Sequence, residues 1–288
     1  MCATQNWRVK ARLSRRGRWL VVAAVVLVVV GGAAVAIPAL ANAALFHPNA
    51  DPASAERLAG NPAMEAVSVP GGYTGWFVHL VDGPAPLVIY FGGNGECAAR
   101  AVLTYDTQDW WGMVEGANFM MIDYPGYGTS TGRPSQPSMY AMALAALDYA
   151  TGRGDVDTTR IIVAGYSLGT GPATYLASQR AVAGLILVAP YNNAVSLYNG
   201  QVNIFHGPLR WLVTQHFNSD QYAPDVTVAP LIITSRADEQ IDHTLAETLA
   251  TAFPKTPQLV VLDGLMHNDY FHDPGVRSLI RAYVQTVV

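Results

Sequence analysis

Short apolar runs alternate with helix-length stretches from about residue 63 to the end of the chain. Runs of four or five apolar residues, many of them β-branched, are typical of strands buried on both faces of a sheet. The expected strands of this kind are residues 87–91, 119–122, 161–164, 185–188, 231–234 and 259–262. The expected helices are residues 98–111, 138–150 (capped by Ser138), 168–180, 245–253 and 276–287. This alternation predicts a mostly parallel sheet with helices on both faces.

Two segments depart from the alternation. Residues 65–69 and 73–80 flank a Pro-Gly-Gly turn and are predicted to form an antiparallel hairpin at the edge of the sheet. Residues 191–225 show no strand and helix repeat, and we interpret them as a short cap insert. The apolar residues of the insert either line an acyl-binding surface or pack it onto the domain, and the sequence favours neither. They are Leu197, Tyr198, Ile204, Phe205, Trp211, Leu212 and Phe217.

The first 62 residues have a different pattern. Residues 1–18 carry six of the 17 basic residues, and no acidic residue precedes Asp51. Residues 19–37 carry no charge, and a helix of that length spans roughly 28 Å, close to the hydrocarbon thickness of a bilayer. The pattern predicts a membrane-spanning helix over residues 19–38, ended by its proline. Residues 39–62 are interpreted as a tether to a domain at 63–288.

A secretory signal peptide is the alternative interpretation of the same segment. Residues 20–30 would form its apolar core, and Ala41-Asn42-Ala43 is an acceptable cleavage site. The basic residues before the span are expected to stay in the cytoplasm. Both interpretations place the main domain outside the cytoplasm, either on a single-pass anchor or secreted or periplasmic after cleavage.

Composition narrows the classes of function. The 288 residues are 51% hydrophobic and 13% charged, which suits one large domain with a short appendage. After residue 18 there remain 11 basic and 21 acidic residues, a net charge of −10. No basic surface is left to neutralise phosphates, so nucleic acid is not an expected partner. Cys2 and Cys97 lie on opposite sides of the apolar span and are not expected to pair.

The sequence Gly165-Tyr166-Ser167-Leu168-Gly169 lies between an expected strand and an expected helix. A Gly-x-Ser-x-Gly motif in this context is typical of a nucleophile elbow, whose sharp turn lifts the serine hydroxyl above the edge of the sheet. Glycines two residues before and after the serine avoid collisions across the turn. Ser167 is therefore the candidate nucleophile.

A serine nucleophile needs a histidine as base and an acid that orients the histidine. In this fold the acid follows the serine along the chain and the histidine comes last. Asp238 lies closest to the end of the strand at 231–234 and is preferred over its neighbours Glu239 and Asp242. Asp238 is therefore the candidate orienting acid.

The base is expected in the loop after the last strand. His267 follows the strand at 259–262 at a short distance, and His272 is its only close competitor. A metal cluster built from these two histidines with Asp269 and Asp273 is disfavoured, because their spacing matches no standard ligand set. His267 is the candidate base, and no metal is expected.

Attack on a carbonyl group develops an oxyanion, which needs preorganised N–H donors. The backbone N–H of Leu168 is one candidate. The other is expected from the loop Gly92-Gly93-Asn94-Gly95, whose glycines let the backbone approach the substrate, and Asn94 is preferred over Gly93. The spacing fits neither a phosphate-binding loop nor a dinucleotide fingerprint, so no cofactor is expected.

Six motifs together resemble the α/β-hydrolase superfamily, and within it the membrane-anchored serine hydrolases close to the depalmitoylase-like αβ-hydrolase-domain proteins. The motifs are Tyr90-Phe91-Gly92-Gly93-Asn94, Asp123-Tyr124-Pro125-Gly126-Tyr127-Gly128, Gly165-Tyr166-Ser167-Leu168-Gly169, Pro208-Leu209-Arg210-Trp211, Ala237-Asp238-Glu239 and His267-Asn268-Asp269. They span roughly residues 65 to 275 in family order. Two positions depart from the family pattern, since Gly92 stands where relatives have histidine and Pro125 where they often have arginine.

The resemblance implies Ser167 as nucleophile, Asp238 as orienting acid and His267 as base of a serine hydrolase. Its expected substrate is a small or lipid-like carboxylic ester or thioester, cleaved through an acyl-enzyme. An amidase or peptidase with the same triad is an open alternative, because specificity lies in the shape of the pocket. A non-catalytic binding domain on the same fold is the other alternative.

Overall fold

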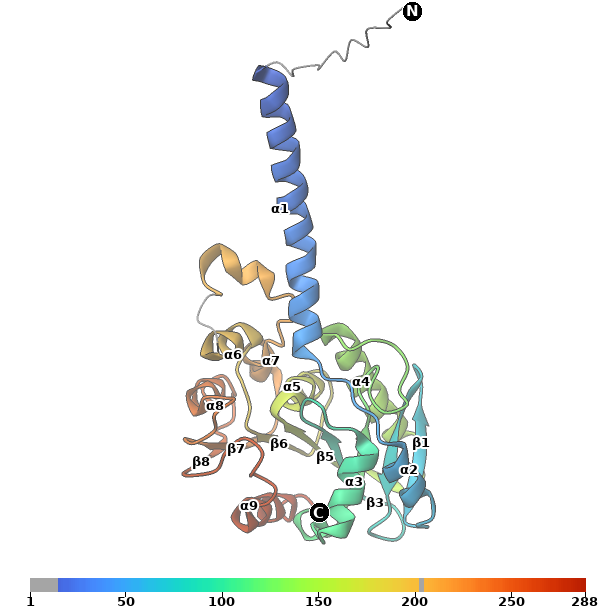
Figure 1. The fold of residues 1–288 in the computed structure, drawn as a ribbon. Coiled ribbons are helices and arrows are strands. Elements are labelled where there is room, and N and C mark those ends of the chain that lie inside the picture. Colours follow the sequence, from blue (N-terminus) through green and yellow to red (C-terminus); the bar gives the residue numbers. More distant parts are fainter. Residues whose placement is uncertain (1–14, 202–204) are drawn as a thin grey trace, which may run out of the picture.

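The computed structural model describes residues 15–201 and 205–288. They form one eight-stranded sheet between layers of helices (Figure 1). In spatial order its strands are β1 (Met64–Val69), β2 (Tyr73–Val78), β4 (Asn118–Ile122), β3 (Ala85–Phe91), β5 (Val156–Tyr166), β6 (Gly184–Val188), β7 (Leu231–Ser235) and β8 (Gln258–Leu262). The pairs β1–β2 and β2–β4 are antiparallel, and the others are parallel. The predicted mostly parallel sheet and its edge hairpin are confirmed.

The carboxyl ends of the parallel strands meet at one edge of the sheet. Phe91 at the end of β3 lies beside Gly165 near the end of β5. Ser235 at the end of β7 lies beside Leu262 at the end of β8. Because parallel strands lead the chain to the same edge, this register brings together the loops that follow these four strands.

Apolar side chains on the two faces of the sheet enter two separate cores. Helices α4 (Gln136–Thr151), α5 (Thr170–Gln179) and α8 (His243–Ala250) contribute to one core. Helices α2 (Pro52–Ala59), α3 (Ala98–Thr107) and α9 (Pro274–Val284) contribute to the other. Along β3, Ile89 is buried in the first core and Val88 in the second. Burial on both faces explains why the strands are unbroken apolar runs.

Two helix ends differ from the prediction. Ser138 is not the N-cap of α4, because Ser135 holds that position and the two serines form a reciprocal capping box. Helix α3 ends at Thr107 rather than near residue 111. Asp109 turns the chain with a φ of 52°, and a separate 3-10 turn, η1 (Trp111–Val114), follows.

The expected tether at residues 39–62 is largely packed structure. The helix predicted to end at residue 38 continues to the end of α1 (Arg15–Leu45). Phe46 is buried in one core, and Leu58 of α2 is buried in the other. Asp51 caps α2 by accepting a hydrogen bond from the backbone N–H of Ser54. The interpretation as a tether is therefore wrong for residues 46–59, whose apolar side chains complete the cores.

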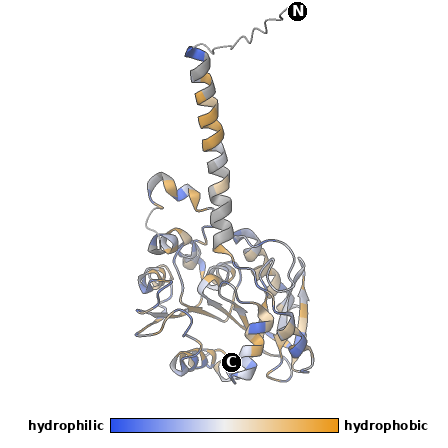
Figure 2. Cartoon of the chain, in the orientation of Figure 1, coloured by the Kyte–Doolittle hydropathy of each residue, from blue (hydrophilic) through white to orange (hydrophobic). Residues whose placement is uncertain are grey.

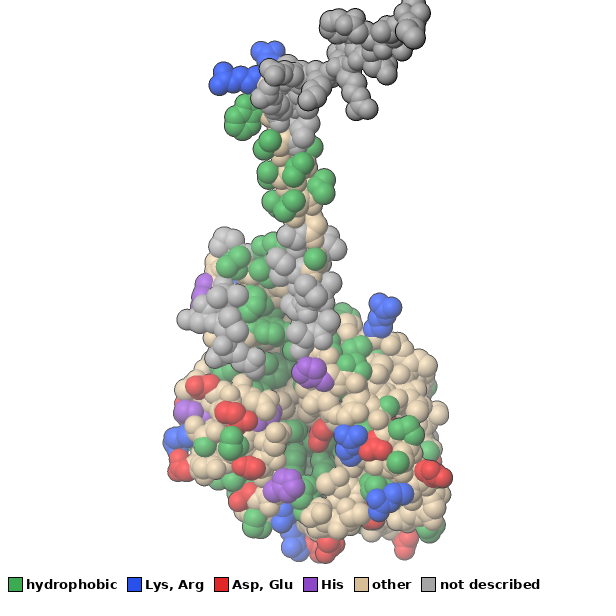
Figure 3. Space-filling view, viewed as in Figure 1, with side chains coloured by type: hydrophobic (Ala, Val, Ile, Leu, Met, Phe, Trp, Pro, Cys, Tyr) green, Lys and Arg blue, Asp and Glu red, His purple; other side chains and the backbone are tan. Residues whose placement is uncertain are grey.

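Helix α1 projects away from the domain (Figure 1). The described apolar side chains of α1 are exposed; they include Trp19, Leu20, Val22 and Val25. The helix is therefore coloured hydrophobic in Figure 2 and carries green side chains in Figure 3. Residues 1–14 of the expected basic segment lie outside the described residues. A search of the described part of the chain finds no helix with the length and apolar character needed to cross a membrane.

The insert between β6 and β7 holds short elements: α6 (Ala194–Gln201), η3 (Gly207–Leu212), α7 (Ser219–Tyr222) and η4 (Ala223–Asp225). The apolar side chains of the insert differ in how far they are buried. Phe217 is buried in the domain core, whereas Leu209 and Trp211 are 46% and 55% exposed. Leu197 and Tyr198 line a cavity with Ser167. Ile204 lies outside the described residues. Phe217 therefore packs the insert onto the domain, whereas Leu197 and Tyr198 line a cavity beside the candidate nucleophile.

Candidate active site

Ser167 stands on a sharp turn between β5 and α5. Its φ of 51° is in the left-handed region, which costs free energy for a residue with a side chain and is typical of nucleophile elbows. A Cβ atom on Gly165 would lie 2.5 Å from the carbonyl oxygen of Gly169, and one on Gly169 would collide with the carbonyl oxygen of Phe91. Both glycines of the motif are therefore required by the close approach of backbone segments.

The three residues proposed as a triad lie in contact. His267 Nε2 is 2.9 Å from Ser167 Oγ, and His267 Nδ1 is 2.9 Å from Asp238 Oδ2. All three are buried and come from the loops after β5, β7 and β8. With its proton on Nδ1, the imidazole donates to the carboxylate and can accept the serine proton on Nε2. This is the arrangement that activates a serine hydroxyl.

Asp238 is held as a carboxylate by several donors. Burial raises its pKa, but the hydrogen bond from His267 and those from the backbone N–H groups of Ile241 and Gln240 leave that pKa below its ordinary value. Tyr270 also donates its hydroxyl to Asp238 Oδ2 at 3.0 Å. Asp238 therefore remains ionised at neutral pH and can stabilise a positive charge on His267.

The rival acid and base candidates occupy other positions. Asp242 caps α8 by accepting a hydrogen bond from the backbone N–H of Thr244. His272 packs edge-on against Trp110, with ring centroids 4.9 Å apart. Glu239 accepts a hydrogen bond from the backbone N–H of His267 at 2.9 Å. Glu239 therefore holds the loop that carries the histidine, a role that sequence reasoning missed.

Tyr166 is a second residue that positions His267. Its hydroxyl donates to the carbonyl oxygen of His267 at 2.5 Å, and its ring stacks beside the imidazole with centroids 5.3 Å apart. Burial raises the pKa of Tyr166, so the hydroxyl stays protonated as a donor. The variable second position of the Gly-x-Ser-x-Gly motif gave no signal for this role, because the histidine loop is distant in sequence.

In the loop after β3, the two backbone N–H groups considered as oxyanion donors differ in their hydrogen bonding. The N–H of Gly93 donates to Glu96 Oε2 at 2.6 Å, so it is already engaged. The backbone N–H of Asn94 has no partner among the described residues. The prediction that favoured Asn94 over Gly93 is consistent with this pattern. The N–H of Leu168 lies at the turn into α5, beside Ser167.

The side chain of Asn94 ties this loop to the end of α1. Its Nδ2 donates to the carbonyl oxygen of Leu45, and its Oδ1 accepts hydrogen bonds from the backbone N–H of His47 and from the hydroxyl of Tyr127. Asn49 adds a bond from its Nδ2 to the carbonyl oxygen of Gly95. Residues 45–49, which we call the strap, thus fix the oxyanion loop from outside the predicted domain.

Two cavities flank Asn94. The Ser167 cavity, of about 220 Å³, has polar and apolar walls in similar proportion; it is lined by Leu45, His47, Asn94, Ser167, Leu168, Leu197, Tyr198, Gln240 and Ile241. The Glu96 cavity, of about 300 Å³, is more aromatic and charged; its main lining residues are Glu96, Tyr105, Trp110, Tyr166, Asn268 and His272. Among the residues that the structure describes, no three His, Cys, Asp or Glu side chains gather to hold a metal ion.

A model of the α/β hydrolase fold family matches residues 86–225. An uncharacterised protein of Mycobacterium tuberculosis strain H37Rv is 33% identical over 260 residues, which cover 88% of this chain and 90% of that protein. The chain belongs to the α/β-hydrolase family. The alpha/beta hydrolase domain-containing protein 17C of Xenopus tropicalis is 32% identical over 152 residues, 53% of this chain and 47% of that protein.

Solved α/β-hydrolase structures share the fold at low identity. An esterase of Pyrococcus furiosus superposes with a TM-score of 0.61 at 16% identity, covering 83% of this chain and 99% of the esterase. An acetyl xylan esterase from a Paenibacillus species has a TM-score of 0.57 at 16% identity, covering 80% and 92%. Esterases are therefore among the proteins that share this architecture.

Proposed function

We propose that this protein is a serine hydrolase that cleaves carboxylic esters or thioesters through an acyl-enzyme. The observation that carries the proposal is the continuous hydrogen-bonded path from Ser167 Oγ through His267 to Asp238, with both contacts at 2.9 Å. A hydroxyl, an imidazole and a buried carboxylate in this order form a nucleophile, a base and an orienting group.

In the acylation step, Ser167 Oγ attacks the carbonyl carbon while His267 Nε2 takes the serine proton. The carbonyl oxygen becomes an oxyanion, for which the backbone N–H groups of Asn94 and Leu168 are the proposed donors. Each such donor typically contributes about 10²–10³-fold in rate. When the bond to the leaving group breaks, the protonated His267 gives that proton to the departing oxygen or sulfur.

Deacylation repeats the same steps with water as the nucleophile. His267 removes a proton from water, the hydroxide attacks the acyl-enzyme, and the proton returns to Ser167 Oγ as the acid is released. Asp238 keeps its charge throughout and stabilises the imidazolium in both steps. The apolar wall of the Ser167 cavity, made by Leu45, Leu197 and Ile241, is the proposed acyl site.

The first test is covalent labelling with a fluorophosphonate probe. The wild-type protein is expected to be labelled, and Ser167→Ala is expected to lose both labelling and hydrolysis of p-nitrophenyl esters. Amide analogues assayed beside the esters separate the proposed esterase from an amidase or peptidase. A folded wild-type protein that neither labels nor hydrolyses any ester would contradict the proposal and favour a binding domain.

We also propose that residues 19–37 attach the protein to a membrane, with the hydrolase domain outside the cytoplasm. Support comes from the uncharged run and the basic residues before it. The full chain is expected to stay in the membrane fraction after alkaline carbonate extraction, and a chain that starts at residue 44 is expected to be released with its activity. Extraction of the full chain by carbonate would contradict this proposal.

A further inference from the structure

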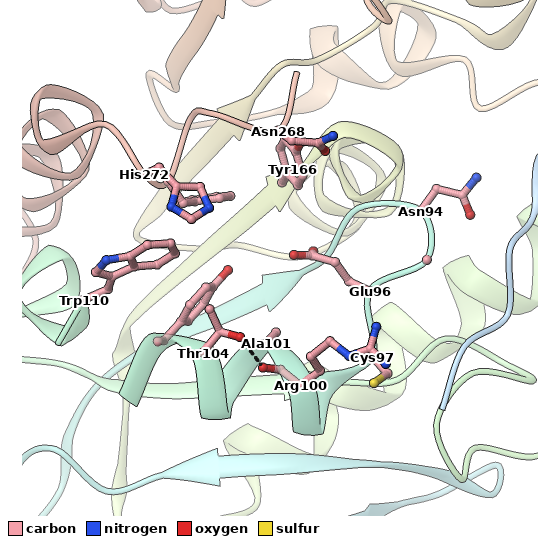
Figure 4. A pocket seen from close by; sticks show the side chains of 13 residues that line it. Asn94, Glu96, Cys97, Arg100, Ala101, Thr104, Trp110, Tyr166, Asn268 and His272 are labelled. Atoms are coloured by element: carbon pink, nitrogen blue, oxygen red, sulfur yellow. Dashed lines mark hydrogen bonds between the residues drawn. The ribbon is translucent and has the colours of Figure 1, made fainter. Parts of the chain in front are cut away.

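The Glu96 cavity contains an unused acceptor. Glu96 Oε2 accepts hydrogen bonds from the N–H of Gly93 at 2.6 Å and from the hydroxyl of Tyr90 at 3.1 Å. Its Oε1 has no hydrogen-bond partner among the described residues, and Figure 4 shows the carboxylate pointing into the cavity. Burial raises the pKa of Glu96 against the effect of these two bonds. A ligand that donates a hydrogen bond to Oε1 or carries a positive charge would lower the free-energy cost of burying the ionised carboxylate.

The other polar groups of the cavity do not balance this charge. Arg100 lines the cavity, but its guanidinium pairs with Asp51 at 2.9 Å. The hydroxyl of Thr104 donates a hydrogen bond to the carbonyl oxygen of Arg100, drawn as the dashed line in Figure 4. Asn268 and His272 are exposed at the mouth. Among the described lining residues, Arg100 is therefore already paired, and His267 behind the lining attracts the Glu96 carboxylate only when its imidazole is protonated.

Aromatic side chains surround this charge. Tyr166 and Trp110 are each 7% exposed and Tyr105 is 3% exposed, so the cavity has low-polarity walls behind an open mouth. A carboxylate attracts a cation more strongly beside such walls than in water. Aromatic ring faces also attract cations, especially ammonium groups. The volume of about 300 Å³ is sufficient for a small organic cation.

The position of the cavity relative to the triad indicates which part of a substrate it receives. It shares Asn94 with the Ser167 cavity, and its residues Tyr166 and Asn268 adjoin Ser167 and His267 in the chain. Ser167 itself lines the Ser167 cavity, whose aliphatic wall of Leu45, Leu197 and Ile241 suits an acyl group. The Glu96 cavity is the other cavity that reaches Asn94, so we assign it to the leaving group, which receives its proton from the imidazole.

We propose that the Glu96 cavity binds the leaving group of the ester substrate, and that this leaving group is a cationic amino alcohol such as choline or ethanolamine. The inference rests on the proposed hydrolase function and extends it to a substrate class. Hydrolysis then releases an amino alcohol from the Glu96 cavity and a carboxylic acid from the Ser167 cavity, with the alcohol proton supplied by His267.

The binding part of the proposal is tested without turnover. Full-length Ser167→Ala protein is titrated calorimetrically with choline and with 3,3-dimethylbutanol, its uncharged analogue of nearly the same shape. Choline is expected to bind about tenfold more tightly, because only the cation is attracted by Glu96. Equal binding of the two alcohols, or binding of neither, would overturn the proposal.

Glu96→Gln and Asp263→Asn form a matched pair of variants. Each removes one negative charge, but Asp263 is exposed and pairs with Arg236 outside the cavity. The preference for choline is expected to vanish in Glu96→Gln and to persist in Asp263→Asn. A preference that survives in Glu96→Gln would show that another group attracts the cation. The comparison of the two alcohols on otherwise unaltered protein stands even where a variant fails to fold.

The catalytic part is tested with butyrylcholine and 3,3-dimethylbutyl butyrate. The wild-type protein is expected to have about tenfold higher kcat/KM for the choline ester, mainly through a lower KM. Loosening of the loop through Gly93 in Glu96→Gln would lower kcat for both esters, whereas loss of the cation site changes only their ratio. Fluorophosphonate labelling of Ser167 with no preference between the esters would refute the leaving-group site and leave the hydrolase proposal intact. Absence of labelling would refute the hydrolase proposal itself.

Discussion

The Ser167 cavity and the Glu96 cavity are separated by one loop and differ in chemistry. The first combines aliphatic side chains, Leu45, Leu197 and Ile241, with polar ones, whereas the second has a half-buried carboxylate among aromatic rings. Asn94 belongs to both, and its backbone N–H is the proposed oxyanion donor. In our proposal the acyl group of an ester lies in the first cavity and a cationic leaving group in the second, with the reacting carbonyl group between them.

The two cavities are also supported differently. The Ser167 side depends on residues 45–49 and on the insert, which are segments added to the core sheet. The Glu96 side is built from α3 and from the loops after β3 and β8. Substitutions in the added segments should therefore alter the acyl side, while the leaving-group side should respond to changes near the sheet.

The largest effect is expected where both cavities depend on the same group. Asp238→Asn should lower kcat by roughly 10⁴-fold for choline and neutral esters alike, because the imidazole loses its orienting carboxylate. Steady-state kinetics of wild-type and Asp238→Asn protein on both esters measure this fall in kcat. Glu239→Gln is the control, since it keeps an acceptor for the N–H of His267 and should lose far less activity. An Asp238→Asn enzyme with nearly full activity would remove Asp238 from the mechanism.

A smaller loss is expected from the residue that joins the cavities. Asn94→Ala removes the hydrogen bonds to Leu45 and His47 but keeps the backbone N–H, so the oxyanion donor should remain yet be less well placed. We expect a fall in kcat of about 10–100-fold on both esters. Asn61→Ala removes a comparable amide contact far from the site and should leave kcat unchanged. Equal kinetics for both variants would mean that the strap does not position the loop.

The acyl side should be separable from the leaving-group side. Leu197→Trp fills part of the Ser167 cavity and should lower kcat/KM for octanoyl esters by about tenfold, with less effect on acetyl esters. The preference for a cationic leaving group should not change. Leu209→Trp introduces the same ring at an exposed position of the insert and serves as the control. An unchanged chain-length profile in Leu197→Trp would place the acyl chain elsewhere.

The smallest expected effect is the pH dependence of the cation preference. The pKa of Glu96 is raised, so its carboxylate takes up a proton at a higher pH than an ordinary glutamate as the solution is acidified. Its charge is fully present above that pKa, and the preference for the choline ester should fall a few-fold as the pH drops through it. The ratio of kcat/KM values for the two esters, measured from pH 8 to pH 5, tests this. A ratio that stays constant over this range would contradict a role for the Glu96 charge.

The sequence predicted the sheet well and pointed to three triad candidates, because both kinds of signal are local. Unbroken apolar runs indicated the strands, and short offsets after three of them indicated Ser167, Asp238 and His267, which the structure brings into contact. It was less reliable for helix ends, where Ser135 rather than Ser138 caps α4. Capping depends on one or two side-chain contacts, which the periodicity of apolar residues does not report.

The sequence also missed the residues that hold the candidate site in place. Nothing local marks Tyr166 as a partner of the His267 carbonyl oxygen, or Glu239 as a partner of its N–H. Residues 39–62 looked like a tether because they are rich in alanine, asparagine and proline. Their role became visible only when Asn94 was seen to bind Leu45 and His47.

By itself, the sequence indicated the candidate residues for chemistry and the order of the elements that present them. A nucleophile elbow, an apolar strand and a glycine-rich loop each depend on a few neighbouring residues, so each can be recognised from a short stretch of sequence. Tertiary structure decided which loops meet. It thereby placed the strap against the oxyanion loop, left one oxygen of Glu96 without a partner among the described residues, and formed two separate cavities. Those features arise from contacts between residues tens of positions apart, and such contacts exist only once the sheet has set the register of its strands.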